Sequence, residues 1–220
     1  MPYIDFLQTV HTRTARNYVQ RVVEHDKAEC AEVSRRFDQD YWDGDRKYGY
    51  GGYRYDGRWL AVAERLAAHY GLRSGARILD IGCGKGFLLH DLMHVVPDAS
   101  VAGLDVSRYA LEHAMEDVRG HLVEGTAAHL PFPDQSFDLV VSINTLHNLR
   151  VFDLDSALRE MQRVSRGPKY IVVDSFRNER EKANFLYWQL TCQCFYTPED
   201  WQWWFEKTGY SGDHSFVLFE

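Results

Sequence analysis

Residues 77–87 read Arg77-Ile78-Leu79-Asp80-Ile81-Gly82-Cys83-Gly84-Lys85-Gly86-Phe87, an apolar run that passes directly into three alternating glycines. The apolar run predicts a short buried strand, the glycines predict a tight turn, and the residues after the turn predict a helix. In an open parallel sheet a ligand binds beyond the carboxyl ends of the strands, where glycine lets the backbone approach it and the next helix presents unpaired N–H groups. We therefore expect this turn to form part of a ligand site.

The same alternation of strand-like and helix-like segments continues on both sides of this stretch. Upstream, apolar residues at helical spacing predict a helix from Leu60 to Tyr70 that ends at Gly71. Strands that alternate with helices predict an α/β fold with a doubly wound, mostly parallel sheet. Downstream, the sequence predicts strands over 100–105, 121–124, 137–143, 169–174 and 215–219, and helices over 87–95, 107–118, 153–165 and 197–209.

The spacing of the glycines distinguishes between two kinds of ligand. The loop that binds dinucleotides has the pattern G-x-G-x-x-G, whereas Gly82, Gly84 and Gly86 give G-x-G-x-G. Phe87 stands where the third glycine of the dinucleotide pattern is needed. Asp80 precedes the first glycine by two residues, where it would repel a pyrophosphate and attract an ammonium group. The loop therefore favours a ligand with a cationic group over a dinucleotide.

A second acid lies at the end of the next predicted strand. Asp105 follows Gly86 by 19 residues, the position from which a carboxylate accepts hydrogen bonds from ribose hydroxyls. Two acids, a glycine loop and a strand-helix alternation together predict a site for a ligand with a ribose and a cationic group. The alternative is that Asp80 and Asp105 only cap turns or helices.

Four segments of this chain resemble the class I S-adenosylmethionine-dependent methyltransferases, namely residues 80–86, 103–107, 130–138 and 144–147. The third carries the pattern L-P-F-x-D-x-S-F-D before an apolar strand and is similar to the subgroup called type 11. The resemblance runs from about residue 77 to residue 174. It implies a Rossmann-like methyltransferase fold, S-adenosylmethionine as the cofactor, and an enzyme that transfers a methyl group.

The resemblance also implies which residues bind the cofactor. The glycine loop would hold its methionine part, Asp105 its ribose, and Thr126 with Ala127 would flank its adenine. Thr126 stands where type 11 members usually have aspartate, so its hydrogen bond to the adenine amino group would lack charge assistance. After Tyr210 the chain has room for little more than one strand, where the family usually forms a hairpin. The residues expected to bind the cofactor are Asp80, Gly82, Cys83, Gly84, Gly86, Asp105, Val106, Thr126, Ala127, Asn144 and Leu146.

One histidine is a candidate for catalysis. His147 follows the predicted strand over 137–143, at the edge where acceptor and methyl group should meet. We expect it to act as a general base for a hydroxyl acceptor, since an imidazole titrates near neutral pH. A carboxylate, phenolate or neutral amine acceptor needs no base, and the alternative for His147 is a packing role beside Phe152. The other histidines show no metal-ligand spacing, so we expect no metal site.

Aromatic residues gather in two segments, with seven between Tyr41 and Trp59 and nine between Phe185 and Phe205. The first segment is too rich in glycine for a regular helix and too aromatic for a disordered linker. It predicts a lid over the cofactor, the alternative being a cap that only covers the sheet. In the second segment, Trp201, Trp204 and Phe205 share a helical face and are expected in the core. The candidates for substrate contact are Tyr50, Tyr53, Arg54, Tyr187, Trp188 and Tyr196.

The length and charge of the chain divide it near residue 75. Residues 1–75 carry 12 Lys or Arg and 11 Asp or Glu, whereas residues 76–220 carry 13 and 21. We therefore expect an N-terminal extension over 1–75 and an acidic cofactor-binding domain over 76–220. The excess of acids argues against a nucleic-acid partner, which requires a clustered basic face. No apolar run is long enough to span a membrane and no signal peptide is evident, so we expect a cytoplasmic protein.

The function expected from the sequence is methyl transfer to a small molecule, such as a sugar or nucleotide-sugar hydroxyl or amine. One alternative is a nicotinamide-dependent oxidoreductase or epimerase, which the missing third glycine disfavours. Another is a catalytically silent S-adenosylmethionine-binding partner subunit, for which Thr126 in place of an acid is the only hint. No oligomeric state is predicted.

Overall fold

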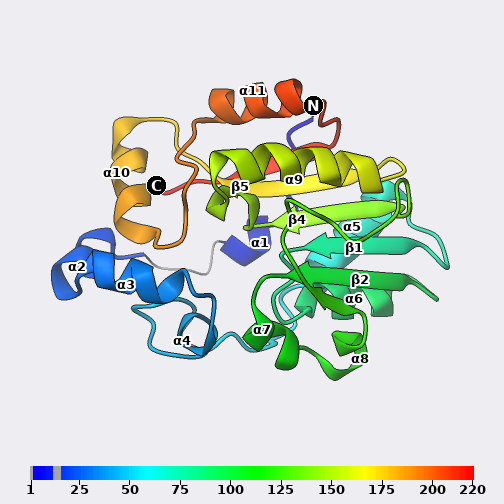
Figure 1. The fold of residues 1–220 in the computed structure, drawn as a ribbon, viewed down its shortest axis with the longest axis horizontal. Helices are drawn as coiled ribbons and strands as arrows, with labels where there is room; N and C mark the ends of the chain where they lie inside the picture. Colours follow the sequence, from blue (N-terminus) through cyan, green and yellow to red (C-terminus); the bar gives the residue numbers. More distant parts are fainter. Residues whose placement is uncertain (1, 12–15) are drawn as a thin grey trace.

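A parallel sheet lies at the centre of the computed structural model, which describes residues 2–11 and 16–220 (Figure 1). Within these residues the strand order is β3-β2-β1-β4-β5-β6, and every neighbouring pair is parallel. The expected α/β fold with a doubly wound sheet is confirmed. The strands are β1 (Arg77–Ile81), β2 (Ser100–Asp105), β3 (Leu122–Glu124), β4 (Leu139–Ile143), β5 (Lys169–Asp174) and β6 (Asp213–Val217).

Helices cover both faces of the sheet, which is why β4 and β5 are buried along their whole length. Apolar residues of α5 and α6 form one core with one face of the sheet, and those of α9 and α11 form the core on the other face. On α9 the buried Leu154, Leu158 and Met161 recur at helical spacing. The helices of this part are α5 (Leu60–Tyr70), α6 (Phe87–Val95), α7 (Arg108–Glu112), α8 (Glu116–Arg119), η1 (Leu146–Asn148), α9 (Val151–Val164), α10 (Glu179–Trp188) and α11 (Pro198–Thr208).

Helix α11 begins and ends where its sequence predicts. Thr197 accepts a hydrogen bond from the N–H of Asp200, whose carboxylate accepts one from the N–H of Thr197. Gly209 ends the helix with φ of 71°, a conformation that glycine adopts without a steric penalty. The expected core positions Trp201, Trp204 and Phe205 are all buried.

The structure differs from the sequence prediction in several local features. The helix predicted over 107–118 is two helices, α7 and α8, because the N–H of Met115 donates to the carbonyl of Lys85 in the glycine loop and not to the preceding turn. Strand β6 begins two residues early because Asp213 already pairs with Tyr170. Helix α10 was not predicted, although Asn178 caps it by accepting the N–H of Glu181.

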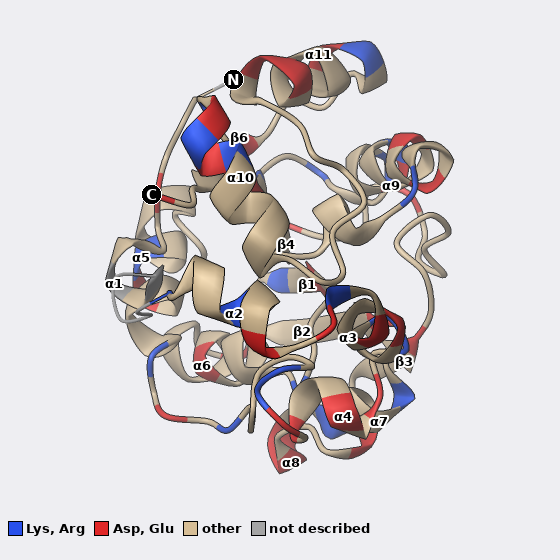
Figure 2. Ribbon diagram, turned by 90° about the vertical axis from the view of Figure 1, so that its left-hand side faces the viewer, with Lys and Arg blue, Asp and Glu red and all other residues tan. Residues whose placement is uncertain are grey.

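The N-terminal segment packs onto the rest of the chain. Phe6, Leu7 and Val10 belong to the same core cluster as α5 and α6, and Tyr3 pairs with His214 in a β-bridge. Both views place α2 and α3 beside α10 (Figures 1 and 2). The predicted boundary at residue 75 falls between α5 and β1, and residues before it share a hydrophobic core with residues after it. The helices of this segment are α1 (Gln8–His11), α2 (Tyr18–Glu24), α3 (Lys27–Ser34) and α4 (Gln39–Trp42).

Among the described helices, none has the length and apolar character needed to cross a bilayer.

Candidate active site

The glycine loop between β1 and α6 brings the backbone close to its neighbours. Gly82, Gly84 and Gly86 all have positive φ, which glycine alone adopts readily. A Cβ on Gly82 would collide with Thr145, and one on Gly84 would lie 2.8 Å from the Trp42 ring. A larger residue at these positions would therefore require the loop, or the side chains packed against it, to shift.

Asp105, at the end of β2, holds this loop in place. One of its carboxylate oxygens accepts the N–H of Gly84 and the other accepts the N–H of Ser107, both at 2.8 Å. Burial raises the pKa of Asp105, while the backbone N–H groups of Ser107 and Gly84 oppose that rise. The carboxylate is thus fixed at the carboxyl edge of the sheet, where it can also receive a ligand hydroxyl.

Asp80, the second acid of the site, is buried at the end of β1. Its Oδ1 has no hydrogen-bond partner among the described residues. Burial, reinforced by the charge of Asp105, raises the pKa of Asp80 to about 8. A buried carboxyl without a partner is costly when ionised, so the position suits a ligand that brings a cation.

The two acids and the glycine loop line a cavity of about 190 Å³, here called the glycine-loop cavity. Three residues expected to bind cofactor lie outside it. Gly86 starts α6 against Val118, Leu146 is buried in the core beside α9, and the hydroxyl of Thr126 accepts the N–H of Ala128. The expected residues that do line this cavity are Asp80, Gly82, Cys83, Gly84, Asp105, Val106, Ala127 and Asn144.

The segment over 41–59 covers the glycine loop, as its composition predicts. The Trp42 indole N–H donates to the hydroxyl of Ser107 at 2.8 Å, and its ring lies on Gly84. The Tyr53 ring stacks on Phe87 with 4.8 Å between ring centroids. Sequence reasoning did not single out Trp42, although its position in a glycine-rich aromatic segment was the available signal. Whether this cover opens as a lid stays a prediction.

A partly buried ion pair attaches the cover to the loop. Lys85 Nζ lies 2.6 Å from Asp43 Oδ2 and donates to the carbonyl of Tyr53 at 2.9 Å. The side chain of Lys85 is 7% exposed and that of Asp43 is 25% exposed. The pair thus joins the glycine loop directly to residues on both sides of the Gly49–Gly52 turn.

We expect Lys85→Met to lower the free energy of unfolding by about 2 kcal/mol, because it leaves the carboxylate of Asp43 without its counter-charge; a fully buried pair would cost about 3–5 kcal/mol. Urea denaturation measures the change. The double variant Lys85→Met/Asp43→Leu removes both charges and should recover part of the loss. A single variant as stable as the wild type would show that the ion pair does not hold the cover.

Asn144 lies directly after β4, between two cavities. Its φ is 56°, uncommon for a residue other than glycine, and its Oδ1 is buried without a partner among the described residues. The backbone N–H donates to the carbonyl of Val172 at 3.0 Å, which holds the turn. A strained residue with a free polar atom, held by its neighbours, is typical of a functional position.

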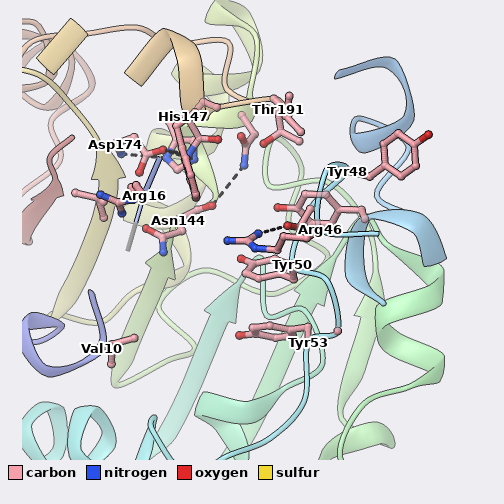
Figure 3. A pocket seen from close by; sticks show the side chains of 18 of the residues that line it. Val10, Arg16, Arg46, Tyr48, Tyr50, Tyr53, Asn144, His147, Asp174 and Thr191 are labelled. Carbon is pink, nitrogen blue, oxygen red and sulfur yellow. Dashed lines mark hydrogen bonds and ion pairs between the residues drawn. The ribbon is translucent and has the colours of Figure 1, made fainter. Parts of the chain in front are cut away.

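A larger cavity of about 380 Å³ adjoins the first, and five arginines line it, so it is called the arginine cavity. Tyr50, Tyr53 and Asn144 line both cavities, and their polar ends point into the shared space (Figure 3). Of the candidates for substrate contact, Tyr50, Tyr53, Arg54 and Trp188 line the arginine cavity.

Two of those candidates lie outside both cavities. Tyr187 is 40% exposed on the outer side of α10. The Tyr196 ring packs against Trp201, with 5.3 Å between ring centroids, at the start of α11. On α10 the side chain of Trp188 lines the arginine cavity, whereas that of Tyr187 faces away from it. The aromatic-rich sequence alone did not show which of these two neighbours faces the cavity.

His147 lines the arginine cavity and contacts β5. Its Nδ1 accepts the N–H of Asp174 at 3.1 Å, and its Nε2 lies 3.4 Å from Asp174 Oδ2. Burial lowers the pKa of His147, while Asp174 opposes that change. The imidazole is therefore neutral, with its proton on the nitrogen that faces the carboxylate. The role of His147 as a general base stays a prediction. For that role, Nδ1 must give up its hydrogen bond from the N–H of Asp174 and accept a proton from the methyl acceptor.

Contrary to the expectation drawn from spacing, the structure brings one set of metal-ligand side chains together. His90 and His94 lie one turn apart on α6, and with Asp117 their ligand atoms fall within 4.8 Å of one another. His90 Nδ1 is 2.6 Å from Asp117 Oδ2. This contact joins the side chains of His90 and Asp117, and the expectation of no metal site stays a prediction.

Comparisons with known proteins agree with this geometry. A family model described as a methyltransferase domain matches residues 72–209. The demethylmenaquinone methyltransferase of Roseiflexus castenholzii is 34% identical over 137 residues, 60% of this chain and 56% of that protein. The ubiquinone/menaquinone biosynthesis C-methyltransferase UbiE of Hahella chejuensis is 38% identical over 113 residues, 47% of this chain and 45% of that protein.

Solved structures show the same fold. The YcgJ protein from Bacillus subtilis superposes with a TM-score of 0.55 at 24% identity, over 70% of this chain and 68% of that chain. The present chain spans about half the length of the curated relatives that it matches. These likenesses concern the sheet and the glycine loop, and the first 71 residues lie outside the family match.

Proposed function

This chain belongs to the class I S-adenosylmethionine-dependent methyltransferases, and on that premise we propose that it methylates a small molecule bound in the arginine cavity. S-adenosylmethionine is the cofactor of the family, and its sulfonium supplies the methyl group. The family match covers the glycine loop and both acids. The acceptor and the residues that bind it are part of the proposal.

The glycine-loop cavity fits the cofactor in its chemistry. The unpartnered Oδ1 of Asp80 suits the ammonium of the methionine part. The carboxylate of Asp105, held by two backbone N–H groups, suits the ribose hydroxyls. The Trp42 ring against Gly84 leaves no space for a side chain in the loop. Together these features support binding of the cofactor along the carboxyl ends of β1 and β2.

The observation that carries the proposal is the wall shared by the two cavities. A molecule in the arginine cavity therefore faces the cofactor across this wall. The seven residues that line both cavities are Tyr41, Tyr50, Tyr53, Trp59, Phe87, Asn144 and Asn148. Holding two reactants in line contributes up to about 7–11 kcal/mol in favourable cases, and the sulfonium carbon is already activated. These residues therefore need mainly to orient the acceptor and exclude water.

The acceptor class is proposed from the lining of the cavity. Trp188 and Tyr50 give the cavity an aromatic lining, although Tyr50 already stacks on Trp42, and such a lining suits an acceptor with an apolar or ring-shaped part. The relatives named above support a small molecule, since one of them is named for demethylmenaquinone. A sugar or nucleotide-sugar acceptor stays within the proposal, with a hydroxyl or an amine as the methylated group.

Calorimetry and a turnover assay test this function. S-adenosylhomocysteine should bind with a stoichiometry near one, whereas NAD and NADP should give no heat of binding. With S-adenosylmethionine and a panel of phenols, carboxylic acids, amines and sugars, one class should yield S-adenosylhomocysteine and a product heavier by one methyl group. Binding of a nicotinamide cofactor alone would overturn the proposal, and cofactor binding without turnover on any class would favour a silent partner subunit.

A further inference from the structure

Three arginines from the N-terminal segment surround one tryptophan in the arginine cavity. The guanidinium carbons of Arg16, Arg21 and Arg46 lie 5.8, 4.7 and 5.6 Å from the centroid of the Trp188 ring. Arg21 belongs to α2, Arg46 follows α4, and Trp188 ends α10. Segments far apart in the sequence thus bring three positive charges to one ring.

None of these three charges has a carboxylate within ion-pair distance among the described residues. Each group instead donates to one backbone carbonyl: Arg16 to Leu218, Arg21 to Trp188, and Arg46 to Gly49. Because a guanidinium carries five N–H donors, most N–H groups of these three side chains have no hydrogen-bond acceptor among the described residues. Arg16 Nε is moreover buried without any partner.

The three groups also repel one another. Burial lowers the pKa of Arg21 and of Arg46; the charge of Arg46 adds to the effect on Arg21, and that of Arg16 to the effect on Arg46. Asp174 attracts Arg16 electrostatically, but its carboxylate contacts His147 and the side-chain amide of Gln189. Unpaired like charges in a partly buried site are unfavourable, so the arrangement is stabilised if an anion enters.

The concentration of positive charge is specific to this cavity. The chain as a whole has a formal charge of −7, and basic and acidic residues are interspersed over the face that carries α2, α3 and α10 (Figure 2). In the cavity lining, five arginines stand against two acids, Asp56 and Asp174. Asp56 is paired with Arg58 at 2.6 Å, which is not one of the three.

We infer that Arg16, Arg21 and Arg46 bind an anionic group, a carboxylate or a phosphate, carried by the methyl acceptor. The inference rests on the proposed function, because it places the acceptor in the arginine cavity. Guanidinium groups bind both kinds of anion with two parallel hydrogen bonds. The acceptor class is thus a small molecule with an acidic group.

The position of the cluster separates this role from cofactor binding. The lining of the glycine-loop cavity contains no arginine among the described residues. The side chain of Arg46 points into the arginine cavity near Tyr50 and Asn144, and Arg16 lies beside Asp174 (Figure 3). An anion held there faces the cofactor across the shared wall.

The test measures binding of small anions to the protein saturated with S-adenosylhomocysteine. Benzoate and phenyl phosphate are the anionic probes, and benzyl alcohol is the neutral probe of similar shape. We expect one or both anions to bind at millimolar concentration or below by ligand-observed NMR, with an affinity that falls as salt is added. Preference between the two anions tells a carboxylate acceptor from a phosphate acceptor. Benzyl alcohol should bind at least tenfold more weakly.

Single variants assign the binding to the cluster. Arg46→Gln and Arg21→Gln should each weaken anion binding about tenfold or more, the loss expected for a charge-assisted pair. Arg36→Gln, at an exposed arginine after α3, is the matched control and should change nothing. The dissociation constant of S-adenosylhomocysteine should stay within twofold in all three variants.

Two outcomes would overturn the inference. Neutral and anionic probes that bind equally, or anions that do not bind at all, would show that the cluster has no anion preference. Variants that lose S-adenosylhomocysteine binding instead would assign the arginines to the carboxylate of the cofactor, and the proposed function would stand. Wild-type protein that fails to bind S-adenosylhomocysteine would contradict the proposed function itself. Because cofactor binding and anion binding are measured separately, this failure is distinguishable from a failure of the anion inference.

Discussion

Replacing Asp105 with alanine is expected to weaken S-adenosylhomocysteine binding by about 100-fold. The carboxylate accepts the N–H groups of Gly84 and Ser107, and we propose that the same oxygens accept hydrogen bonds from the ribose hydroxyls. Hydrogen bonds to a charged acceptor contribute about 1.5–3 kcal/mol each, so two lost ribose bonds account for the expected factor. Calorimetric titration at pH 7.5 measures it directly.

Asp105→Asn distinguishes the charge from the shape of this side chain. The amide retains one acceptor oxygen, so we expect a loss nearer tenfold. Because Asp105→Ala also leaves the N–H groups of Gly84 and Ser107 without their acceptor, thermal unfolding of each variant is measured to show that binding is compared between folded proteins. Asp40→Ala, at an exposed acid of α4 outside both cavities, is the control. Binding by Asp105→Ala within threefold of the wild type would remove Asp105 from the ribose site.

The parts of the site that could be predicted from the sequence are those fixed by local structure. Gly82, Gly84 and Asp105 follow from a strand, a tight turn and the end of the next strand, which parallel pairing brings to one edge. The parallel, doubly wound character of the sheet follows from alternating strands and helices, whereas its strand order was not predicted and comes from the structure. The single strand after α11 is likewise a consequence of the few residues that follow Tyr210.

Contacts between distant segments escaped prediction. Arg21 donates to the carbonyl of Trp188, 167 positions away, and no periodicity relates two such residues. Trp188 was proposed for its aromatic character, but its neighbours depend on how α2 and α10 pack together. Thr126 does not line the glycine-loop cavity, and its hydroxyl accepts the N–H of Ala128 in its own turn, so its role at the adenine stays a prediction. Local patterns thus predict the cofactor site better than the acceptor site.

The affinity for S-adenosylhomocysteine is expected to rise with pH through the titration of Asp80. Burial and the charge of Asp105 raise the pKa of Asp80 to about 8 in the unliganded protein. At pH 6 the carboxyl is therefore protonated and neutral, whereas the ammonium of the ligand favours the ionised form. Binding must release this proton below pH 8, so the apparent affinity falls as pH falls.

The sign and size of the effect follow from that linkage. Below its raised pKa, a carboxyl that must ionise on binding reduces the affinity about tenfold per pH unit, or about fiftyfold between pH 8 and pH 6. Calorimetry at pH 7 in two buffers of different ionisation enthalpy should report release of close to one proton. For folding the sign is opposite to that of a salt-bridged acid, since a raised carboxyl pKa means that stability declines as pH rises toward 8.

Asp80→Asn provides the decisive comparison because it keeps the shape of the side chain and removes its titration. We expect the variant to bind S-adenosylhomocysteine more weakly than the wild type at pH 8, with little change between pH 6 and pH 8 and no proton release. Asp105 also has a raised pKa, and its backbone N–H donors oppose that rise because they stabilise the ionised form. If the wild-type affinity were the same at pH 6 and pH 8, the ammonium would bind elsewhere.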